Sequence, residues 1–297
     1  MNNTLKTILS FMIFSFLLSN SSFAIKVLTY NICWECMTGT GDQGSAKALG
    51  KICKFIPGKK KTYCAENIAE EIDSIYEHYN SEIYASSGSI EPWDFVGMQE
   101  AKNIESLDSA LSLQSLKKVS GSGLSTLYNP NYTLQRTLYG RITSGRPVQV
   151  LIFSNIIFIN LHAPHNPKAS LIEQKIGEAF KNRKNKLSQS DIDKLKNHRI
   201  IVVGDFNDHD GIFWKNQKKY NPFRPLRAIG IDTPVYLPGE PPKSCCSTKV
   251  PLNRVTLVGD YIFDSTINTD FKFKVPSLYN KNTPKSDHLP VVYVGDN

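Results

Sequence analysis

Short apolar runs that end at polar or turn-forming residues recur along the chain. Runs of this kind, rich in β-branched and aromatic residues, are typical of buried β-strands. The hairpin dipeptide Ser154–Asn155 separates two of them. The sequence therefore predicts strands at residues 25–30, 93–98, 148–153, 156–161, 199–203, 255–263 and 289–294.

Other segments show helical spacing or no regular pattern. Residues 65–79 place their apolar side chains on one helical face, which can pack on a sheet. Residues 168–198 predict a lysine-rich pair of helices, with Ser190 as the N-cap of the second. Residues 38–62 and the proline-rich residues 222–251 are predicted to be loops. This mixed order favours a single α/β domain built on packed sheets.

The first 24 residues have the layout of a secretory signal peptide. Lys6 precedes the apolar run 8–18, and small and polar residues follow as far as Ala24. The apolar run is shorter than the ~20 residues that a membrane-spanning helix needs. We therefore expect residues 1–24 to be removed and residues 25–297 to form the domain of a secreted or periplasmic protein. An uncleaved N-terminal anchor is the alternative.

Net charge indicates the kind of partner. Residues 1–24 hold one of the 35 basic residues and none of the 27 acidic ones, so their removal would leave 273 residues (297 minus 24) with a formal charge of +7 (34 minus 27). A basic surplus favours polyanionic partners such as nucleic acid or acidic lipid. No obligate protein partner is expected.

Cysteine content predicts cross-links in an exported chain. An even number of cysteines in an oxidising compartment indicates up to three disulfides. The pair Cys33-x-x-Cys36 leaves a redox or zinc site as the alternative. Because Cys245 and Cys246 are adjacent in sequence, they would pair with different partners. These disulfides would tie residues 236–250 to residues 33–64. The six are Cys33, Cys36, Cys53, Cys64, Cys245 and Cys246.

Polar residues suited to metal and proton chemistry recur where the apolar runs end. Strand ends converge on one rim of a sheet in α/β folds, and such rims bind ligands. Each segment alone has an ordinary explanation, such as a turn-forming asparagine or a core histidine. The occurrence of six such segments in one chain, in this order, favours a functional site. Its members are Tyr30-Asn31, Gln99-Glu100, Asn160-Leu161-His162, Gly204-Asp205-Phe206-Asn207, Gly259-Asp260-Tyr261-Ile262 and Ser286-Asp287-His288.

In these segments the sequence resembles the endonuclease/exonuclease/phosphatase superfamily. The resemblance spans nearly all of residues 25–297 and implies that they form a catalytic domain. It implies an α/β four-layer sandwich, in which two packed, mostly antiparallel β-sheets are flanked by helices and the site lies at the sheet edge. The matching segments are LTYN at 28–31, GMQE at 97–100, INLHAP at 159–164, VVGDFND at 202–208, DYIF at 260–263 and SDHLPV at 286–291.

The resemblance also implies a divalent-cation site. Glu100 would be the principal ligand, helped by Asn31 and Asp287. Hard oxygen ligands suit Mg²⁺ better than zinc, with Mn²⁺ and Ca²⁺ as the alternatives. The ion would polarise phosphoryl oxygens and neutralise charge that builds up at the attacked phosphorus.

Two histidine–carboxylate pairs would carry the proton transfers. The resemblance implies that His288, oriented by Asp260, removes a proton from the attacking water. His162, paired with Asp205, would donate to or stabilise the departing oxygen, and Asn207 would hold a nonbridging oxygen. Each carboxylate would fix the tautomer of its imidazole and support its charged form.

The sequence departs from the apurinic-endonuclease branch at two positions. His162 stands where that branch has another residue, and Cys33 stands where it has an aspartate. Both features favour the deoxyribonuclease I, sphingomyelinase and phosphatase branches, and they leave open whether one metal ion or two are used.

The function predicted is a secreted, metal-dependent phosphodiesterase, with an endonuclease acting on DNA or RNA as the first choice. Basic side chains beside the motifs would contact phosphates, and Tyr139 would contact a sugar or base. Gly140, Gly145 and Pro147 predict a turn near the rim. The basic candidates are Lys102, Arg136, Arg141, Arg146 and Lys168.

Two other classes of function remain open. One is a phospholipid or sphingomyelin phosphodiesterase or a phosphoinositide phosphatase, for which the short segment 212–214 is the best candidate for an exposed apolar hairpin that meets membrane lipid. The other is a catalytically inactive binding protein.

Overall fold

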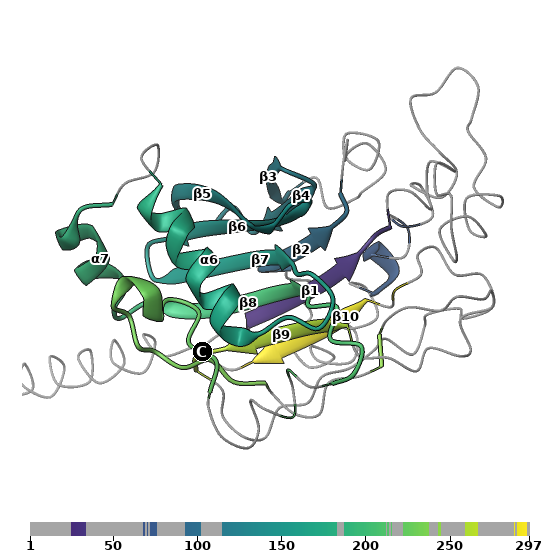
Figure 1. The fold of residues 1–297 in the computed structure, drawn as a ribbon. Helices are drawn as coiled ribbons and strands as arrows, with labels where there is room; N and C mark the ends of the chain where they lie inside the picture. The colour runs from purple at the N-terminus through teal and green to yellow at the C-terminus, as the bar shows by residue number, and fades with distance from the viewer. Residues whose placement is uncertain are drawn as a thin grey trace, which may run out of the picture.

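Two five-stranded β-sheets form the centre of the described part of the chain in the computed structural model (Figure 1). One sheet has the strand order β10-β1-β2-β4-β3 and the other β5-β6-β7-β8-β9. The structure describes residues 25–33, 68, 70, 72–75, 93–101, 115–182, 187–211, 213, 215, 222–237, 243–244, 259–266, 288 and 290–295.

The strands are 5–10 residues long. The first sheet comprises β1 (Ile25–Asn31), β2 (Phe95–Gln99), β3 (Lys117–Gly121), β4 (Leu124–Tyr128) and β10 (Val291–Gly295). The second comprises β5 (Leu134–Thr143), β6 (Arg146–Phe153), β7 (Ile156–His162), β8 (Arg199–Asp205) and β9 (Asp260–Asp264). The helices whose bounds lie in the described ranges are α6 (Ala169–Lys181), α7 (Gln189–Leu195) and the 3-10 turn η1 (Arg227–Ile229). Residues 68, 70 and 72–75, within the predicted helix 65–79, are helical as well.

Strand direction and register bring polar residues to one edge of the sandwich. The pairs β1–β2 and β7–β8 are parallel, whereas the other pairs are antiparallel. Because parallel strands end at the same edge, the carboxyl ends of each parallel pair lie together. In the second sheet, His162 is aligned with Asp205 and Asp205 with Asp260. Residues aligned across strands point to the same face, so these three side chains share one face.

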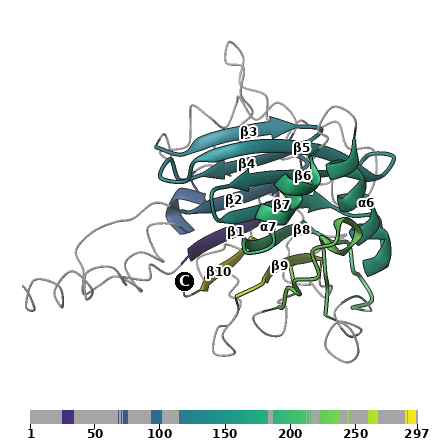
Figure 2. The ribbon, with the colours of Figure 1, turned by 90° about the vertical axis from the view of Figure 1, so that its left-hand side faces the viewer.

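The two sheets pack face to face, and α6 covers the outer face of the second sheet (Figures 1 and 2). Phe95 stacks on Phe158, with ring centroids 4.7 Å apart, in the apolar layer between the sheets. The sheets approach so closely that a Cβ atom on Gly97 would lie 2.4 Å from Cγ2 of Val203. This contact explains why β2 has a glycine two residues before Gln99.

Most strand predictions are confirmed, and the differences have physical causes. The strands β3, β4 and β5 were not predicted. Gly140 lies within β5 rather than in a turn. Its lack of a side chain lets α6 pack closely on the strand, because a Cβ there would lie 2.9 Å from the Cβ of Ala179. Among the described helices, none is both long and apolar enough to span a membrane.

The prediction that Ser190 caps the second helix is wrong. Ser188 is the N-cap of α7, and its Oγ accepts a hydrogen bond from the backbone N–H of Asp191 at 3.1 Å. The Asp191 carboxylate accepts in return from the backbone N–H of Ser188 at 3.1 Å. This reciprocal capping box satisfies two N–H groups at the start of the helix.

Loss of the N-cap hydroxyl should destabilise the fold. We expect Ser188→Ala to lower the free energy of unfolding by about 1 kcal/mol, since an N-cap serine satisfies a helix N–H that alanine cannot. Urea denaturation measures the change. Ser190→Ala is the matched control and should leave the urea midpoint almost unchanged. An equal loss in both variants would contradict the cap assignment.

Candidate active site

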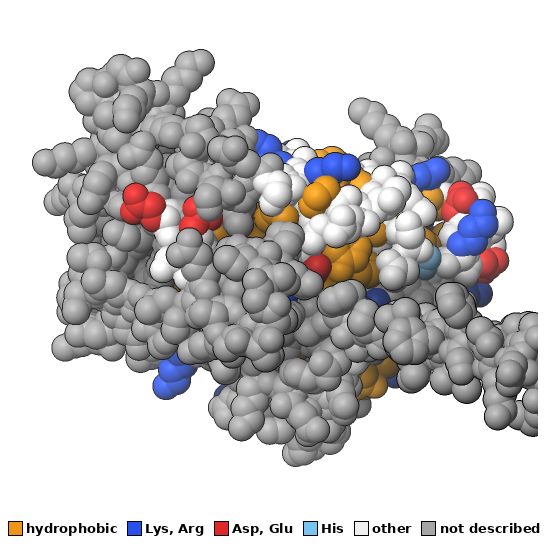
Figure 3. Space-filling model, turned by 180° about the vertical axis from the view of Figure 1, so that it is seen from behind, with side chains coloured by type: hydrophobic (Ala, Val, Ile, Leu, Met, Phe, Trp, Pro, Cys, Tyr) orange, Lys and Arg blue, Asp and Glu red, His pale blue; other side chains and the backbone are white. Residues whose placement is uncertain are grey.

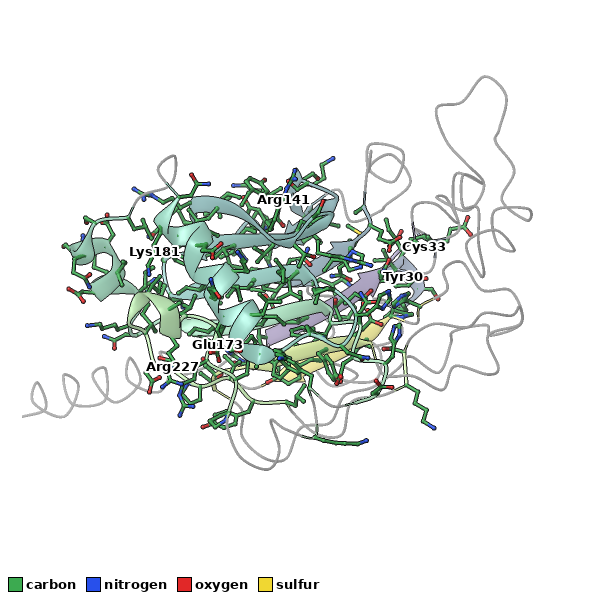
Figure 4. The ribbon with its side chains drawn as sticks, viewed as in Figure 1. Tyr30, Cys33, Arg141, Glu173, Lys181 and Arg227 are labelled. Atoms are coloured by element: carbon green, nitrogen blue, oxygen red, sulfur yellow. The ribbon has the colours of Figure 1, made fainter. Side chains whose placement is uncertain are left out.

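Asn31, at the end of β1, lies at the centre of a buried polar cluster. Its Nδ2 donates a hydrogen bond to Asp205 Oδ2 at 3.0 Å and to Glu100 Oε1 at 3.4 Å, and lies 3.5 Å from His288 Nε2. Its Oδ1 accepts from the backbone N–H of Cys33 at 3.0 Å, which fixes the orientation of the amide. In Figure 4, Tyr30 and Cys33 mark this end of β1. The predicted convergence of strand ends from both sheets is therefore present.

His288 and Asp260 form a close, fully buried pair. His288 Nδ1 lies 2.9 Å from Asp260 Oδ2. Burial raises the pKa of Asp260, against the opposing effect of His288. Because the ionised carboxylate accepts the Nδ1 proton, Nε2 is the nitrogen left to accept another proton. Nε2 points into the cluster, 3.7 Å from Asp205 Oδ2.

His162 is held by Arg146 as well as by Asp205. Its Nε2 contacts Nη1 of Arg146 and lies 3.5 Å from Asp205 Oδ2, which is longer than a strong charge-assisted hydrogen bond. Arginine can only donate, so Nε2 accepts and the imidazole is neutral. Burial lowers the pKa of His162 to about 4; Asp205 opposes this shift, and Arg146 and His288 add to it.

Asp205 is shared between the two histidines. Burial alone would raise its pKa, but His288, His162 and the N–H groups of Asn31 and Asn207 hold the pKa below its ordinary value. The backbone N–H of Asn207 donates to Asp205 Oδ1 at 2.7 Å. Both oxygens therefore have donors, as a buried carboxylate requires.

Strained backbone conformations gather at the strand ends around the cluster. Cys33, Glu100 and Asn207 have φ angles of 44°, 54° and 48°, a left-handed region that costs free energy for residues other than glycine. Each residue follows a strand that contributes to the site. In Asn207 this geometry lets Nδ2 donate to the carbonyl of Ala163 at 2.9 Å.

A layer of amide side chains links the two sheets beneath the cluster. Gln99 Nε2 donates to Asn160 Oδ1 at 2.8 Å, and Asn160 Nδ2 donates to the carbonyl of Ser125 at 3.0 Å. Thr126 continues the layer by donating to Gln149 Oε1 at 2.7 Å. All five residues are fully buried, so these bonds fix the spacing of the sheets at the level of the site.

The other predicted site residues lie in different places. Arg141 is exposed on β5 and aligned with Pro147, next to Arg146 on β6. Tyr139 donates from its hydroxyl to the carbonyl of Ser120 on β3 at 3.1 Å, so it joins β5 to the first sheet. Asp287 and Lys102 lie outside the described residues.

Arg136 does not adjoin the motifs as predicted. It lines a cavity of about 530 Å³ together with Ser154 and Leu195, whereas His162 ends β7 at the opposite end from Ser154. Cys33 is the single cysteine in the described ranges, and it is not a free thiol. The predicted pairing of the other five, which lie outside those ranges, stays a prediction.

Two supporting contacts were not predicted. Tyr261 donates from its hydroxyl to Asp208 Oδ2 at 2.6 Å, and Asp208 Oδ1 accepts from the backbone N–H of Phe213 at 3.0 Å. Ser244 Oγ accepts from the backbone N–H of Asp260 at 3.0 Å. Asp208 and Tyr261 each follow a site residue by one position, but nothing in the sequence shows that they meet.

Several groups of the cluster could hold a cation. Within the described part of the chain, one group of three metal-ligating side chains has its ligand atoms within 4.8 Å of one another: Asp205, Asp260 and His288. Glu100 lies beside them, and its side chain is 32% exposed and thus open to solvent. Two neighbouring buried carboxylates form a site of negative charge that a divalent cation would neutralise.

No protein-family model matches this sequence. A protein of Acanthamoeba polyphaga mimivirus, the uncharacterized protein L684, is 29% identical to it over 283 residues. The match covers 90% of this chain but 49% of the viral protein, so the chain spans about half the length of that relative.

Solved structures share the arrangement of the two sheets. An endonuclease/exonuclease/phosphatase family protein from Bacteroides thetaiotaomicron superimposes with a TM-score of 0.54 at 15% identity, covering 93% of this chain and 96% of that one. This chain has the endonuclease/exonuclease/phosphatase fold. Truncated TDP2 from Caenorhabditis elegans shares this fold with a TM-score of 0.54 at 12% identity, covering 93% and 98% of the two chains. The predicted fold class is thus confirmed.

A third structure with the endonuclease/exonuclease/phosphatase fold is a mannosyl-6-phosphatase from Bacteroides thetaiotaomicron. It gives a TM-score of 0.50 at 17% identity and covers 91% of this chain and 98% of its own. At these identities the likeness shows the fold, and function has to be argued from the site.

The Tyr261–Asp208 contact should contribute to the stability of this end of the sheet. We expect Tyr261→Phe to lower the free energy of unfolding by about 2 kcal/mol, because it removes a donor from a buried carboxylate. Urea denaturation tests this. Tyr236→Phe is the control, since Tyr236 is 46% exposed, and it should have almost no effect. Equal stability of Tyr261→Phe and the parent protein would contradict the role given to this contact.

Proposed function

We propose that this chain is an exported, divalent-metal-dependent phosphoesterase that cleaves phosphodiester bonds of nucleic acid. The observation that carries the proposal is the position of Asp205 Oδ2, which lies 3.5 Å from His162 Nε2 and 3.7 Å from His288 Nε2. Two imidazoles thus face one carboxylate, beside Glu100 and Asn31. A base on one side of the reacting phosphate and a group beside the departing oxygen on the other need such an arrangement.

The residues present fit a hard divalent cation. Glu100 and Asn31, with Asp287, would hold Mg²⁺, or Mn²⁺ or Ca²⁺ in its place, because carboxylate and amide oxygens are the donors that these ions prefer. To act as a ligand, Asn31 Oδ1 would have to leave the backbone N–H of Cys33, since Asn31 now turns its Nδ2 toward Glu100. When bound, the ion supplies charge neutralisation at the phosphoryl oxygens. Asp205, whose pKa is held low, adds a buried negative charge next to Asn31 and Glu100, and this charge would favour a cation there.

The chain's own residues divide the proton transfers. Asp260 holds His288 at Nδ1, which leaves Nε2 to take a proton from the attacking water. His162 is neutral and accepts from Arg146, so it has no proton at Nε2 to donate, and the positive charge of Arg146 beside it would stabilise the departing oxygen. Asn207 would hold a nonbridging oxygen.

The described surface favours a nucleic-acid substrate over a membrane lipid, whereas basic charge suits either nucleic acid or acidic lipid. The chain carries a formal charge of +8, and Arg141 and Arg146 lie on adjacent strands near the site. In contrast, Phe213, in the segment considered for lipid contact, is buried against Phe206. Among the described large apolar side chains, Tyr236 is the exposed one.

On the face shown in Figure 3, the described basic side chains are dispersed, and some lie beside acidic ones. Among the described residues, Arg141 and Arg146 beside the site are the candidates for phosphate contacts.

Nicking of supercoiled plasmid tests the reaction and its base. With Mg²⁺ the protein should nick the plasmid, and EDTA should abolish nicking. His288→Ala should reduce the rate at least 100-fold, the usual contribution of a general base. His198→Ala, at the far end of the second sheet, is the control. Intact plasmid together with hydrolysis of phosphocholine lipid or phosphoinositide would contradict the proposed substrate. Inactivity on every phosphate ester would contradict the proposed enzyme.

Substitution of Glu100 should alter the metal dependence. We expect Glu100→Gln to raise the Mg²⁺ concentration for half-maximal activity about 10-fold or more, because the neutral amide binds a hard cation more weakly. Excess Mg²⁺ should restore part of the rate. A Mg²⁺ titration of the nicking rate measures both effects. Glu178→Gln, on the exposed side of α6, should leave the titration unchanged; an unchanged titration for Glu100→Gln would show that another residue holds the ion.

A further inference from the structure

We propose that His165 and His209 form a subsite for a second phosphate, next to the one that is cleaved. This inference rests on the proposed function and deepens it. It means that the preferred substrates carry phosphates on neighbouring units, as a polynucleotide chain does. Neither histidine has a role in the proton transfers described above.

The two histidines lie side by side on the loops that follow β7 and β8. Their ring centroids are 4.8 Å apart, with the planes inclined by 57°. Asn166 holds the loops together: its Nδ2 donates to Asp210 Oδ2 at 2.8 Å, and its backbone N–H donates to the carbonyl of Asn207 at 2.9 Å. Asn166 has a φ of 47°, so this connection is made at the cost of backbone strain.

The pair adjoins the candidate active site. His165 follows His162 by three residues, and its positive form would lower the pKa of His162. His209 follows Asp205 by four residues; its pKa is lowered by burial and by His165, while Asp205 acts in the opposite direction. Both rings therefore lie within electrostatic range of the groups that face the scissile phosphate.

The chemistry of the pair fits an anion. His165 is exposed and His209 half-buried, so ring N–H groups can reach a ligand from solvent. Lys215 Nζ lies 3.3 Å from the backbone oxygen of Asp210 and adds positive charge to the same loop. The Asp210 carboxylate accepts from Asn166, which partly satisfies its charge.

A resident metal ion fits this pair less well. Neither histidine belongs to the one group of three metal-ligating side chains found in the described ranges. Two imidazoles with a single oxyanion between them would donate one hydrogen bond each, and hydrogen bonds to a charged group are stronger than those between neutral groups.

Phosphate binding can be measured without catalysis. The Cε1–H signals of the six histidines, assigned with His165→Ala and His209→Ala, are followed by NMR during a titration with inorganic phosphate in the absence of metal. The signals of His165 and His209 should shift together and saturate, while that of His198 stays in place. Unchanged signals for the pair, or shifts produced by Zn²⁺ and not by phosphate, would overturn the proposal.

Kinetics then test the substrate class. The three substrates are a thymidine dinucleotide with a 5′-phosphate, the same dinucleotide without it, and bis(p-nitrophenyl) phosphate. In the double variant His165→Ala, His209→Ala, the KM for the 5′-phosphorylated dinucleotide should rise about 10-fold, with kcat unchanged. The KM for the other two should stay unchanged, which also shows that the site is folded.

The outcomes separate the two proposals. Equal changes on all three substrates would show a structural role for the pair, and no change on the first would show that it does not bind the flanking phosphate; either overturns the subsite. If the parent protein cleaves none of the three, the proposed function fails, and the NMR titration still decides whether the pair binds phosphate.

Discussion

A single buried carboxylate, that of Asp205, organises the candidate site. Burial of a charge is costly unless its oxygens have partners. Asp205 meets this requirement through Asn31 of the first sheet at Oδ2 and the backbone N–H of Asn207 at Oδ1, and the Nε2 atoms of both site histidines lie 3.5 and 3.7 Å from its Oδ2. The polar groups of the site are therefore gathered around the Asp205 carboxylate, which needs hydrogen-bond donors because it is buried between the two sheets. Its low pKa keeps the charge in place at neutral pH.

The sandwich is built so that this carboxylate can be reached from both sheets. Gly97 lets β2 approach β8, and the buried bonds from Gln99 to Asn160 set the distance between the layers. Above that layer, Glu100 and Asn207 turn out of their strands through left-handed conformations. Strain at these positions is sustained by well-packed strands on either side. The buried amide layer and the strained residues at the strand ends together fix the positions of the polar groups in the site.

Much of this could be predicted from sequence, for reasons that differ between elements. In the predicted strand 199–203, residues 200–203 are apolar and buried, so the pattern alone reveals a strand that ends at Asp205. The strand β3 has mostly exposed or half-exposed side chains, and its pattern gives no such signal. Ser188 and Asp191 do form a visible capping pattern, which Ser190 obscured. The contact of Arg146 with His162 depends on the alignment of β6 with β7, which no local pattern encodes.

The claim that Asp205 couples the two imidazoles is tested most directly by a double-mutant cycle on the nicking rate. Asp205→Asn, His288→Ala and the combined variant are compared with the parent protein. Residues that act as one unit show strongly non-additive effects. We predict that the combined variant is scarcely slower than the slower single variant. Rate losses that multiply would show that Asp205 and His288 act independently, and would contradict the central role of the shared carboxylate.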